Sequence, residues 1–215
     1  GDADIARTVN LMVQHKFCNA GQACLAPTRF FVDRRIYGDF VDAFGAATQA
    51  LRVGAGLQAD TQMGPVASAR RQAAVTDLIA RSVAAGARRV ASAVPEAGYF
   101  VPPTLLADVP LDAPVMSEEP FGPVACAVPF DSLDQAIAQA NHNPYGLAGY
   151  LFTDSAKAIL AVSERLEVGS LAVNGMGVSV PEAPFGGVKD SGYGSESGIE
   201  GMEAFLETKF MHYVA

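Results

Sequence analysis

The sequence predicts an α/β fold in which a largely parallel sheet is flanked by helices. Short runs rich in β-branched and aromatic residues alternate along the chain with longer amphipathic runs. This alternation is typical of parallel strands joined by helical crossovers. Half of the 215 residues are hydrophobic, which suffices for a sizeable core in one domain. Only 18% are charged, as in a folded rather than a disordered chain.

The helices are predicted from apolar residues that recur at helical spacing. Asp2 and Asp4 can cap a first helix, whose apolar positions extend to Phe17. Later amphipathic runs predict helices over residues 37–51, 68–85, 133–140 and 155–166. The predicted strands cover residues 28–32, 89–93, 105–109, 124–130, 148–152 and 170–173.

The last run, FLETKFMHYVA, has the alternation of a strand but no obvious partner in the rest of the sequence. A half-apolar strand at a chain end needs the edge of a sheet to pair with. We therefore expect residues 1–204 to form the domain and residues 205–215 to form an oligomerisation strand that joins a neighbouring subunit.

Charge and cysteine content exclude several classes of protein. The net charge of −8 argues against nucleic acid and anionic membranes as partners. No apolar run is long enough to span a bilayer, and no signal peptide opens the chain. Three cysteines are too few for a disulfide framework, which favours a cytoplasmic protein. The cysteines and histidines are scattered without ligand spacing, so we expect no metal site.

Cys24 lies in the loop NAGQACLAPTR, between a predicted helix and a predicted strand, and its neighbours are small. An inert buried thiol is the ordinary alternative, because free cysteine packs as a small hydrophobe. A loop with Gly21 nearby instead permits close backbone approach, and its N–H groups can stabilise an oxyanion. Cys18 follows the helical pattern and Cys126 lies in an apolar strand, so both are interpreted as packing residues.

The string VGAGLQAD fits a dinucleotide-binding fingerprint only in its letters. A helical pattern precedes it, and Met63-Gly64-Pro65 prevents a helix from following it. We interpret it as an ordinary turn.

A second informative stretch is MSEEPFGPV, which places two adjacent carboxylates before a rigid turn. Glu118 is interpreted as part of a solvated acidic turn. A carboxylate fixed beside Phe121 could accept hydrogen bonds from a sugar diol. Two further Gly-rich loops, NHNPYGLAGYLF and PEAPFGGVKDSGYG, flank strands, where ligand sites of α/β proteins gather.

Together these stretches resemble the catalytic domain of the aldehyde dehydrogenase superfamily, most closely its succinate-semialdehyde dehydrogenase-like branch. NAGQAC resembles the nucleophile loop and EEPFGPV the nicotinamide-ribose loop, and NPYGLAGYLFTDS, VNG and PFGGVKDSGYG follow in the family's order. The resemblance covers essentially the whole chain. It implies that Cys24 attacks an aldehyde, that Glu119 and Phe121 bind NAD or NADP, and that Phe185 is an aromatic wall of the substrate pocket.

The reaction implied by the resemblance oxidises an aldehyde to a carboxylic acid. The thiolate adds to the aldehyde to give a thiohemiacetal, hydride passes to the cofactor, and a glutamate-activated water hydrolyses the thioester. The resemblance places the N-terminal NAD-binding domain, this general base and an oxyanion asparagine upstream of residue 1. We therefore expect the chain to be the C-terminal catalytic part of a homodimeric or homotetrameric enzyme, and to be inactive alone.

The resemblance implies that the substrate is a small aldehyde, whose identity depends on two positions. The succinate-semialdehyde branch holds the far carboxylate with an arginine six residues before the nucleophile and a serine five residues before Pro-Phe-Gly-Gly. Ser179 matches the serine, but Cys18 occupies the arginine position. A neutral thiol cannot form a bidentate ion pair, so an aromatic or less acidic aldehyde is equally compatible.

Two other functions remain open from the sequence. A catalytically silent homologue could use the fold as a structural or binding module, although the presence of Cys24, Glu119 and Phe121 together argues against it. A cysteine-dependent esterase would release an ester chromophore without NAD, and this distinguishes it from both other possibilities.

Overall fold

The computed structural model describes residues 1–91, 93–95 and 97–215. Its main sheet has four strands in the order β1 (Arg29–Asp33), β4 (Val124–Phe130), β3 (Thr104–Ala107) and β2 (Arg88–Ala91). β1 and β3 both pair with β4 in parallel, whereas β2 pairs with β3 in antiparallel fashion. The sheet is therefore mixed, with one antiparallel strand at its edge. Ser92, which belongs to the predicted strand 89–93, lies outside the described residues.

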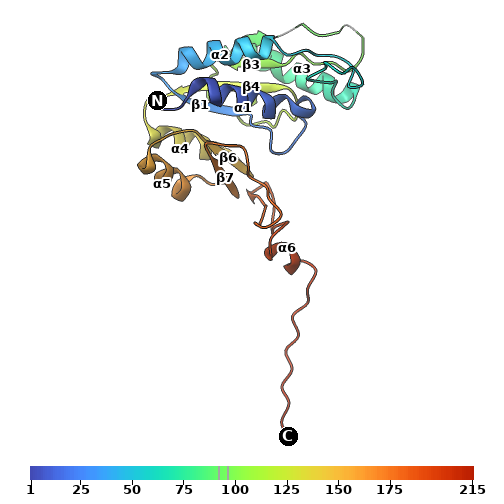
Figure 1. Cartoon of the computed structure of the whole chain (residues 1–215), viewed down its shortest axis with the longest axis vertical. Coiled ribbons are helices and arrows are strands. Elements are labelled where there is room, and N and C mark those ends of the chain that lie inside the picture. Colours follow the sequence, from blue (N-terminus) through green and yellow to red (C-terminus); the bar gives the residue numbers. More distant parts are fainter. Residues whose placement is uncertain (92, 96) are drawn as a thin grey trace.

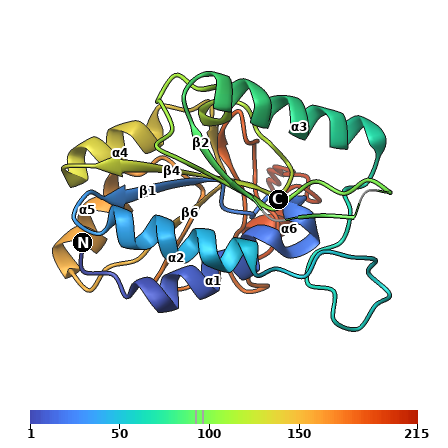
Figure 2. The same cartoon turned by 90° about the horizontal axis from the view of Figure 1, so that it is seen from above.

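Helices cover both faces of this sheet. α1 (Ile5–Phe17) and α2 (Tyr37–Gln49) lie on one side, and α3 (Ala69–Ala84) lies on the other (Figure 2). Asp4 caps α1 by accepting a hydrogen bond from the N–H of Arg7, and Ser68 caps α3 in the same way. Asp2, the other predicted cap, instead accepts hydrogen bonds from the hydroxyl and backbone of Thr153–Asp154.

The second half of the chain adds a smaller layer below the main sheet (Figure 1). Here α4 (Leu133–Asn141) and α5 (Ala156–Arg165) accompany two short sheets. β6 (Ala148–Leu151) pairs in parallel with β7 (Ser170–Val173). The remaining short elements are β5 (Tyr145–Gly146), its antiparallel partner β8 (Val188–Lys189), η1 (Cys18–Gly21), η2 (Pro114–Met116) and α6 (Glu200–Glu203).

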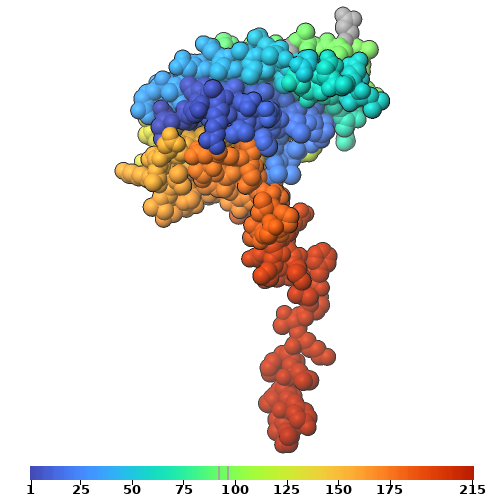
Figure 3. All heavy atoms as spheres, viewed as in Figure 1, coloured from blue at the N-terminus to red at the C-terminus, as the bar shows by residue number. Residues whose placement is uncertain are grey.

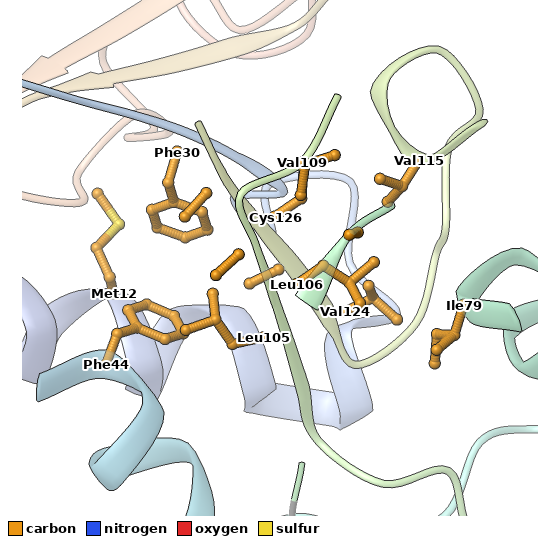
Figure 4. Packing of buried hydrophobic residues seen from close by; sticks show 14 of the residues in the cluster. Met12, Phe30, Phe44, Ile79, Leu105, Leu106, Val109, Val115, Val124 and Cys126 are labelled. Carbon is orange, nitrogen blue, oxygen red and sulfur yellow. The ribbon is translucent and has the colours of Figure 1, made fainter. Parts of the chain in front are cut away.

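The core lies between the main sheet and the helices. β4 is buried over its first five residues, as expected for a central strand covered on both faces. Phe44 from α2 packs edge-on against Phe30 from β1, with ring centroids 5.1 Å apart. Figure 4 shows these two rings beside Leu105 and Met12. This packing fixes the end of α1 and the start of β1, and the loop between them carries Cys24.

The predicted C-terminal strand is not paired within the described chain. From Leu206 to Ala215 the backbone forms no helix or strand, and the run extends away from the body (Figure 3). Its large apolar side chains are exposed. Among the described residues, none of the helices combines the length and the apolar character needed to cross a membrane.

Candidate active site

The loop that carries Cys24 begins with three consecutive residues in the left-handed region. Asn19, Ala20 and Gly21 have φ values of 50°, 54° and 70°. Two of them carry side chains, for which this conformation is unfavourable. Two reciprocal hydrogen bonds stabilise this conformation. The side-chain amide of Asn19 donates to the backbone carbonyl of Gln22, and the side-chain amide of Gln22 donates to the backbone carbonyl of Asn19, both at 3.0 Å. The end of α1 is thus turned sharply toward Cys24.

Cys24 lies in a tight turn and its side chain is exposed. The turn is closed by the N–H of Ala26, which donates to the carbonyl of Ala23 at 3.0 Å. Among the described residues, the backbone N–H of Cys24 has no hydrogen-bond acceptor. The thiol is therefore accessible, and a free N–H lies beside it that could donate to a developing oxyanion.

Tyr150 of β6 holds Leu25, the residue that follows Cys24. Its hydroxyl donates to the carbonyl of Leu25 at 2.8 Å. Burial raises the pKa of the Tyr150 phenol to about 12, and the electrostatic effect of the nearby Cys24 sulfur adds to this shift. The phenol consequently stays protonated and can remain a donor throughout the neutral pH range.

The loop of residues 118–122 lies directly against the Cys24 loop. A Cβ atom added to Gly21 would stand only 2.2 Å from the carbonyl oxygen of Gly122. Any side chain at residue 21 would therefore push the two loops apart. Cys24 and Glu119 both line one cavity of about 590 Å³, whose walls also include β1 and β6.

The two adjacent carboxylates differ in their partners. Arg81 of α3 donates two hydrogen bonds to Glu118, at 2.7 and 2.8 Å, and this ion pair lowers the pKa of Glu118. Within the described chain, the exposed carboxylate of Glu119 makes no hydrogen bond or ion pair. Glu118 is thus occupied, and Glu119 is available to a ligand.

Phe121 is a strained residue next to this carboxylate. Its φ is 38°, and the guanidinium of Arg71 lies 5.9 Å from the centroid of its ring. Arg71 also donates to the carbonyl of Pro120 at 3.3 Å. On the other side of the turn, a Cβ atom at Gly122 would meet Val75 at 2.6 Å. Contacts from α3 therefore determine where the Phe121 ring lies.

The predicted substrate residues do not line the cavity that Cys24 and Glu119 share. Ser179 is exposed in the segment after β7, and Phe185 is half-buried and exchanges two backbone hydrogen bonds of 2.7 Å with Glu196. Cys18 is exposed, so its interpretation as a packing residue is wrong. The physical reason is that α1 ends at Phe17, and the left-handed turn then takes the chain off the buried face. Cys126 is fully buried, as predicted.

Lys16 is a buried cation that the sequence analysis did not identify. Only 1% of its surface is exposed, and its ammonium donates to the Thr28 hydroxyl at 3.5 Å. Burial lowers the pKa of Lys16 to about 8, against the opposing effects of Cys126 and Glu119. Its place on the buried face of α1 was visible in the helical spacing, but a lysine there is usually interpreted as solvated.

No metal centre is evident in the part of the chain that the structure describes. In that part, no three side chains of histidine, cysteine, aspartate or glutamate are grouped so that they could hold an ion.

A family model described as the aldehyde dehydrogenase family matches residues 1–211. Curated relatives include 4-(hydroxymethyl)benzenesulfonate dehydrogenase TsaD1 of Comamonas testosteroni, which is 95% identical over all of this chain and 45% of its own length. The succinate-semialdehyde dehydrogenase of Paenarthrobacter nicotinovorans is 38% identical over 98% of this chain and 47% of its own length. The chain thus spans about half the length of these curated relatives.

Solved structures give the same fold. Aldehyde dehydrogenase of Mycobacterium tuberculosis in complex with NAD+ superimposes with a TM-score of 0.92 at 36% identity, over 100% of this chain and 46% of that one. An Escherichia coli NADP-dependent enzyme superimposes with a TM-score of 0.93 at 38% identity, over 98% of this chain and 44% of that one.

Proposed function

Because this chain belongs to the aldehyde dehydrogenase family, we propose that the protein containing it oxidises an aldehyde to a carboxylic acid with NAD or NADP. The observation that carries this proposal is the exposed thiol of Cys24 beside its free N–H, in a loop packed against the loop of Glu119. Residues 1–204 form the catalytic domain in this proposal.

Cys24 is the nucleophile. Its thiolate forms a C–S bond with the aldehyde carbon while the C=O π bond opens, and the electron pair moves to the oxygen. The N–H of Cys24 is placed to donate to that oxyanion, since it has no other acceptor among the described residues. Tyr150 keeps the carbonyl of the next residue in place through its 2.8 Å bond.

Glu119 and Phe121 fit the ribose end of a nicotinamide cofactor. The free carboxylate of Glu119 can accept two hydrogen bonds from a diol. Phe121 lies two residues further along the same loop and contributes a half-buried apolar ring. When bound, NAD or NADP supplies the acceptor for the hydride that leaves the substrate carbon. Hydride transfer would need the Cys24 loop and the Glu119 loop to stay close together, and the close approach of Gly21 to Gly122 keeps them so.

Release of the acid requires a base that this chain does not provide in the proposal. The resemblance assigns that role to a glutamate upstream of residue 1, which activates the water that hydrolyses the thioester. The 215-residue chain alone is therefore expected to oxidise no aldehyde.

The proposed substrate is an aromatic aldehyde that carries a sulfonate. A relative that is 95% identical is named for 4-(hydroxymethyl)benzenesulfonate. A hydroxymethyl carbon has no C=O bond for Cys24 to attack, whereas the corresponding formyl carbon has one. Cys18 stands where the succinate-semialdehyde branch has an arginine, so that branch's ion pair with a far carboxylate is not formed at this position.

We further propose that the protein is a cytoplasmic homodimer or homotetramer. All three cysteines are free, which suits a reducing compartment. The exposed apolar side chains of residues 205–215 support association with a neighbouring subunit.

The test measures NADH or NADPH formation by the full-length protein with 4-formylbenzenesulfonate and with succinate semialdehyde. Cys24→Ala should reduce kcat by at least about a thousandfold, because the covalent step is lost. Cys126→Ala, which removes a buried thiol with no proposed role, should retain activity. Equal activity in Cys24→Ala and wild type would refute the proposal, and Cys24-dependent ester cleavage without any aldehyde oxidation would support the esterase alternative.

A further inference from the structure

The first turn of α3 contacts both loops of the candidate site. The residue just before its cap, Ala67, donates its backbone N–H to the side-chain oxygen of Gln22 at 2.9 Å. Gln22 belongs to the Cys24 loop and itself bonds Asn19. The same turn carries Arg71, whose N–H donates to the Ser68 cap at 3.2 Å. The N-terminal end of α3 therefore contacts both the Cys24 loop and the loop of residues 118–122, which we call the cofactor loop.

Arg71 makes two different contacts with the cofactor loop. Its guanidinium donates to the carbonyl of Pro120 at 3.3 Å and lies 5.9 Å from the Phe121 ring centroid. The first contact fixes the backbone just after Glu119, and the second is a cation–π contact with the ring. The side chain is half-buried, so water screens these contacts less than it would on an open surface.

The loop needs such support because its own geometry is unfavourable. Phe121 has a φ of 38°, which costs free energy for a residue with a side chain. Gly122 lies between Val75 of α3 and Gly21 of the nucleophile loop, with no room for a Cβ atom on the Val75 side. A change at Arg71 would thus be transmitted to Glu119 on one side and to the Phe121 ring on the other.

We propose that Arg71 is a positioning residue for the cofactor: through its hydrogen bond to Pro120 and its cation–π contact with Phe121, it holds the ribose-binding carboxylate of Glu119 at a fixed distance from the Cys24 loop. This inference rests on the proposed function, because it assumes that NAD or NADP binds at Glu119 and Phe121. Arg71 itself touches neither substrate nor reacting atoms in this role.

The neighbouring Arg70 provides a matched control. It lies in the same turn, carries the same charge and is exposed, and among the described residues it makes no hydrogen bond or ion pair. Replacing either arginine by alanine changes the net charge and the helix propensity equally. Only the Arg71 variant removes the contacts with Pro120 and Phe121.

The experiment compares Arg71→Ala, Arg71→Lys and Arg70→Ala in the full-length protein by steady-state kinetics and by calorimetric titration with NAD+ and NADP+. Arg71→Ala should raise the KM and Kd for the cofactor about three- to tenfold and leave the KM for the aldehyde within about twofold. Arg71→Lys, which keeps the cation but not the planar donor, should recover part of the loss. Arg70→Ala should match wild type.

A purely structural role would lower the thermal midpoint of Arg71→Ala without this separation between cofactor and aldehyde. If Arg71→Ala does not fold, the cofactor KM and Kd of the folded Arg71→Lys variant are compared with those of Arg70→Ala instead, and this comparison tests the positioning role. Equal cofactor KM and Kd in the Arg71 variants and Arg70→Ala would overturn the positioning role alone. Wild-type protein that binds neither cofactor would overturn the proposed function, and the inference with it.

Discussion

At the scale of single residues, the hydroxyl of Tyr150 connects β6 to the residue that follows the candidate nucleophile. Tyr150→Phe removes this bond and little else. We expect kcat/KM of the full-length protein to fall about three- to tenfold, because a buried hydrogen bond contributes about 1 kcal/mol and here orders the loop of Cys24. Steady-state kinetics with the sulfonated benzaldehyde would measure the change.

Tyr37→Phe is the control for this substitution. Tyr37 also donates its hydroxyl to a backbone carbonyl, that of Ala127, at 3.2 Å, but it lies on α2. The control variant should be less stable to urea and should keep its kcat/KM. A Tyr150→Phe enzyme with unchanged kcat/KM would contradict the role given to this hydroxyl.

The three thiols should react with iodoacetamide according to their accessibility. Cys24 and Cys18 are exposed, whereas Cys126 is buried and its pKa is raised to about 12 by burial. Peptide mapping after brief treatment should find label on Cys24 and Cys18, and on Cys126 only after unfolding. Early label on Cys126 would show that the β4 core opens in the native protein.

The sequence identified some site residues and could not identify others. Cys24 and the carboxylate pair were visible because small residues and prolines surround them. The choice between Glu118 and Glu119 came from a resemblance, and physically it depends on Arg81, which lies far away in the sequence. Arg71 gave no signal, since an arginine in the first turn of an amphipathic helix is usually solvated.

At the scale of elements, the buried Lys16 of α1 lowers the free energy of unfolding. Folding lowers the pKa of this lysine from 10.5 to about 8, so the folded state loses the proton at a lower pH than the unfolded state. Between about pH 8 and 10.5 the unfolded state binds more protons, and this group makes the unfolding free energy rise with pH. Below about pH 8 both states are protonated and the full penalty, on the order of 3 kcal/mol, applies.

Lys16→Met removes the cation and keeps the volume. At pH 7 the variant of the 215-residue chain should be more stable than wild type by about 1–3 kcal/mol, and the difference should shrink toward pH 10. Urea denaturation at several pH values measures both effects. A difference that does not vary with pH would mean that the lysine is solvated in the folded state.

The helices were predictable because an amphipathic face repeats over many residues, and α1 to α5 begin and end within about two residues of the predicted positions. The strand β2 was predicted, but its antiparallel direction was not, because alternation in a short strand carries no information on the neighbour's orientation. Cys18 was misplaced for a related reason: helical spacing does not reveal the residue at which a helix stops.

At the scale of the whole molecule, the exposed C-terminal run makes association testable. Deleting residues 207–215 from the full-length protein should shift a dimer or tetramer toward monomer in light scattering, because the exposed apolar run would no longer be present to pair with a neighbour's sheet. The deletion leaves the Cys24 loop intact. Alkylation of Cys24 should therefore proceed at an unchanged rate in the shortened protein.

A point substitution in the same run is the control for the deletion, because it leaves the length of the chain unchanged. Lys209→Ala removes a charge from the same run and leaves its apolar side chains, so its oligomer should remain. A deletion variant that keeps the native oligomer would show that the run serves its own chain instead.

The isolation of residues 205–215 from the body has a consequence for the lifetime of the protein in a cell. Proteases bind their targets as extended backbone, and a chymotrypsin-like enzyme prefers a large apolar side chain such as Phe205 or Phe210, each 88% exposed. A newly made copy that has not met a partner would present this cleavage site, whereas an assembled copy would shelter it.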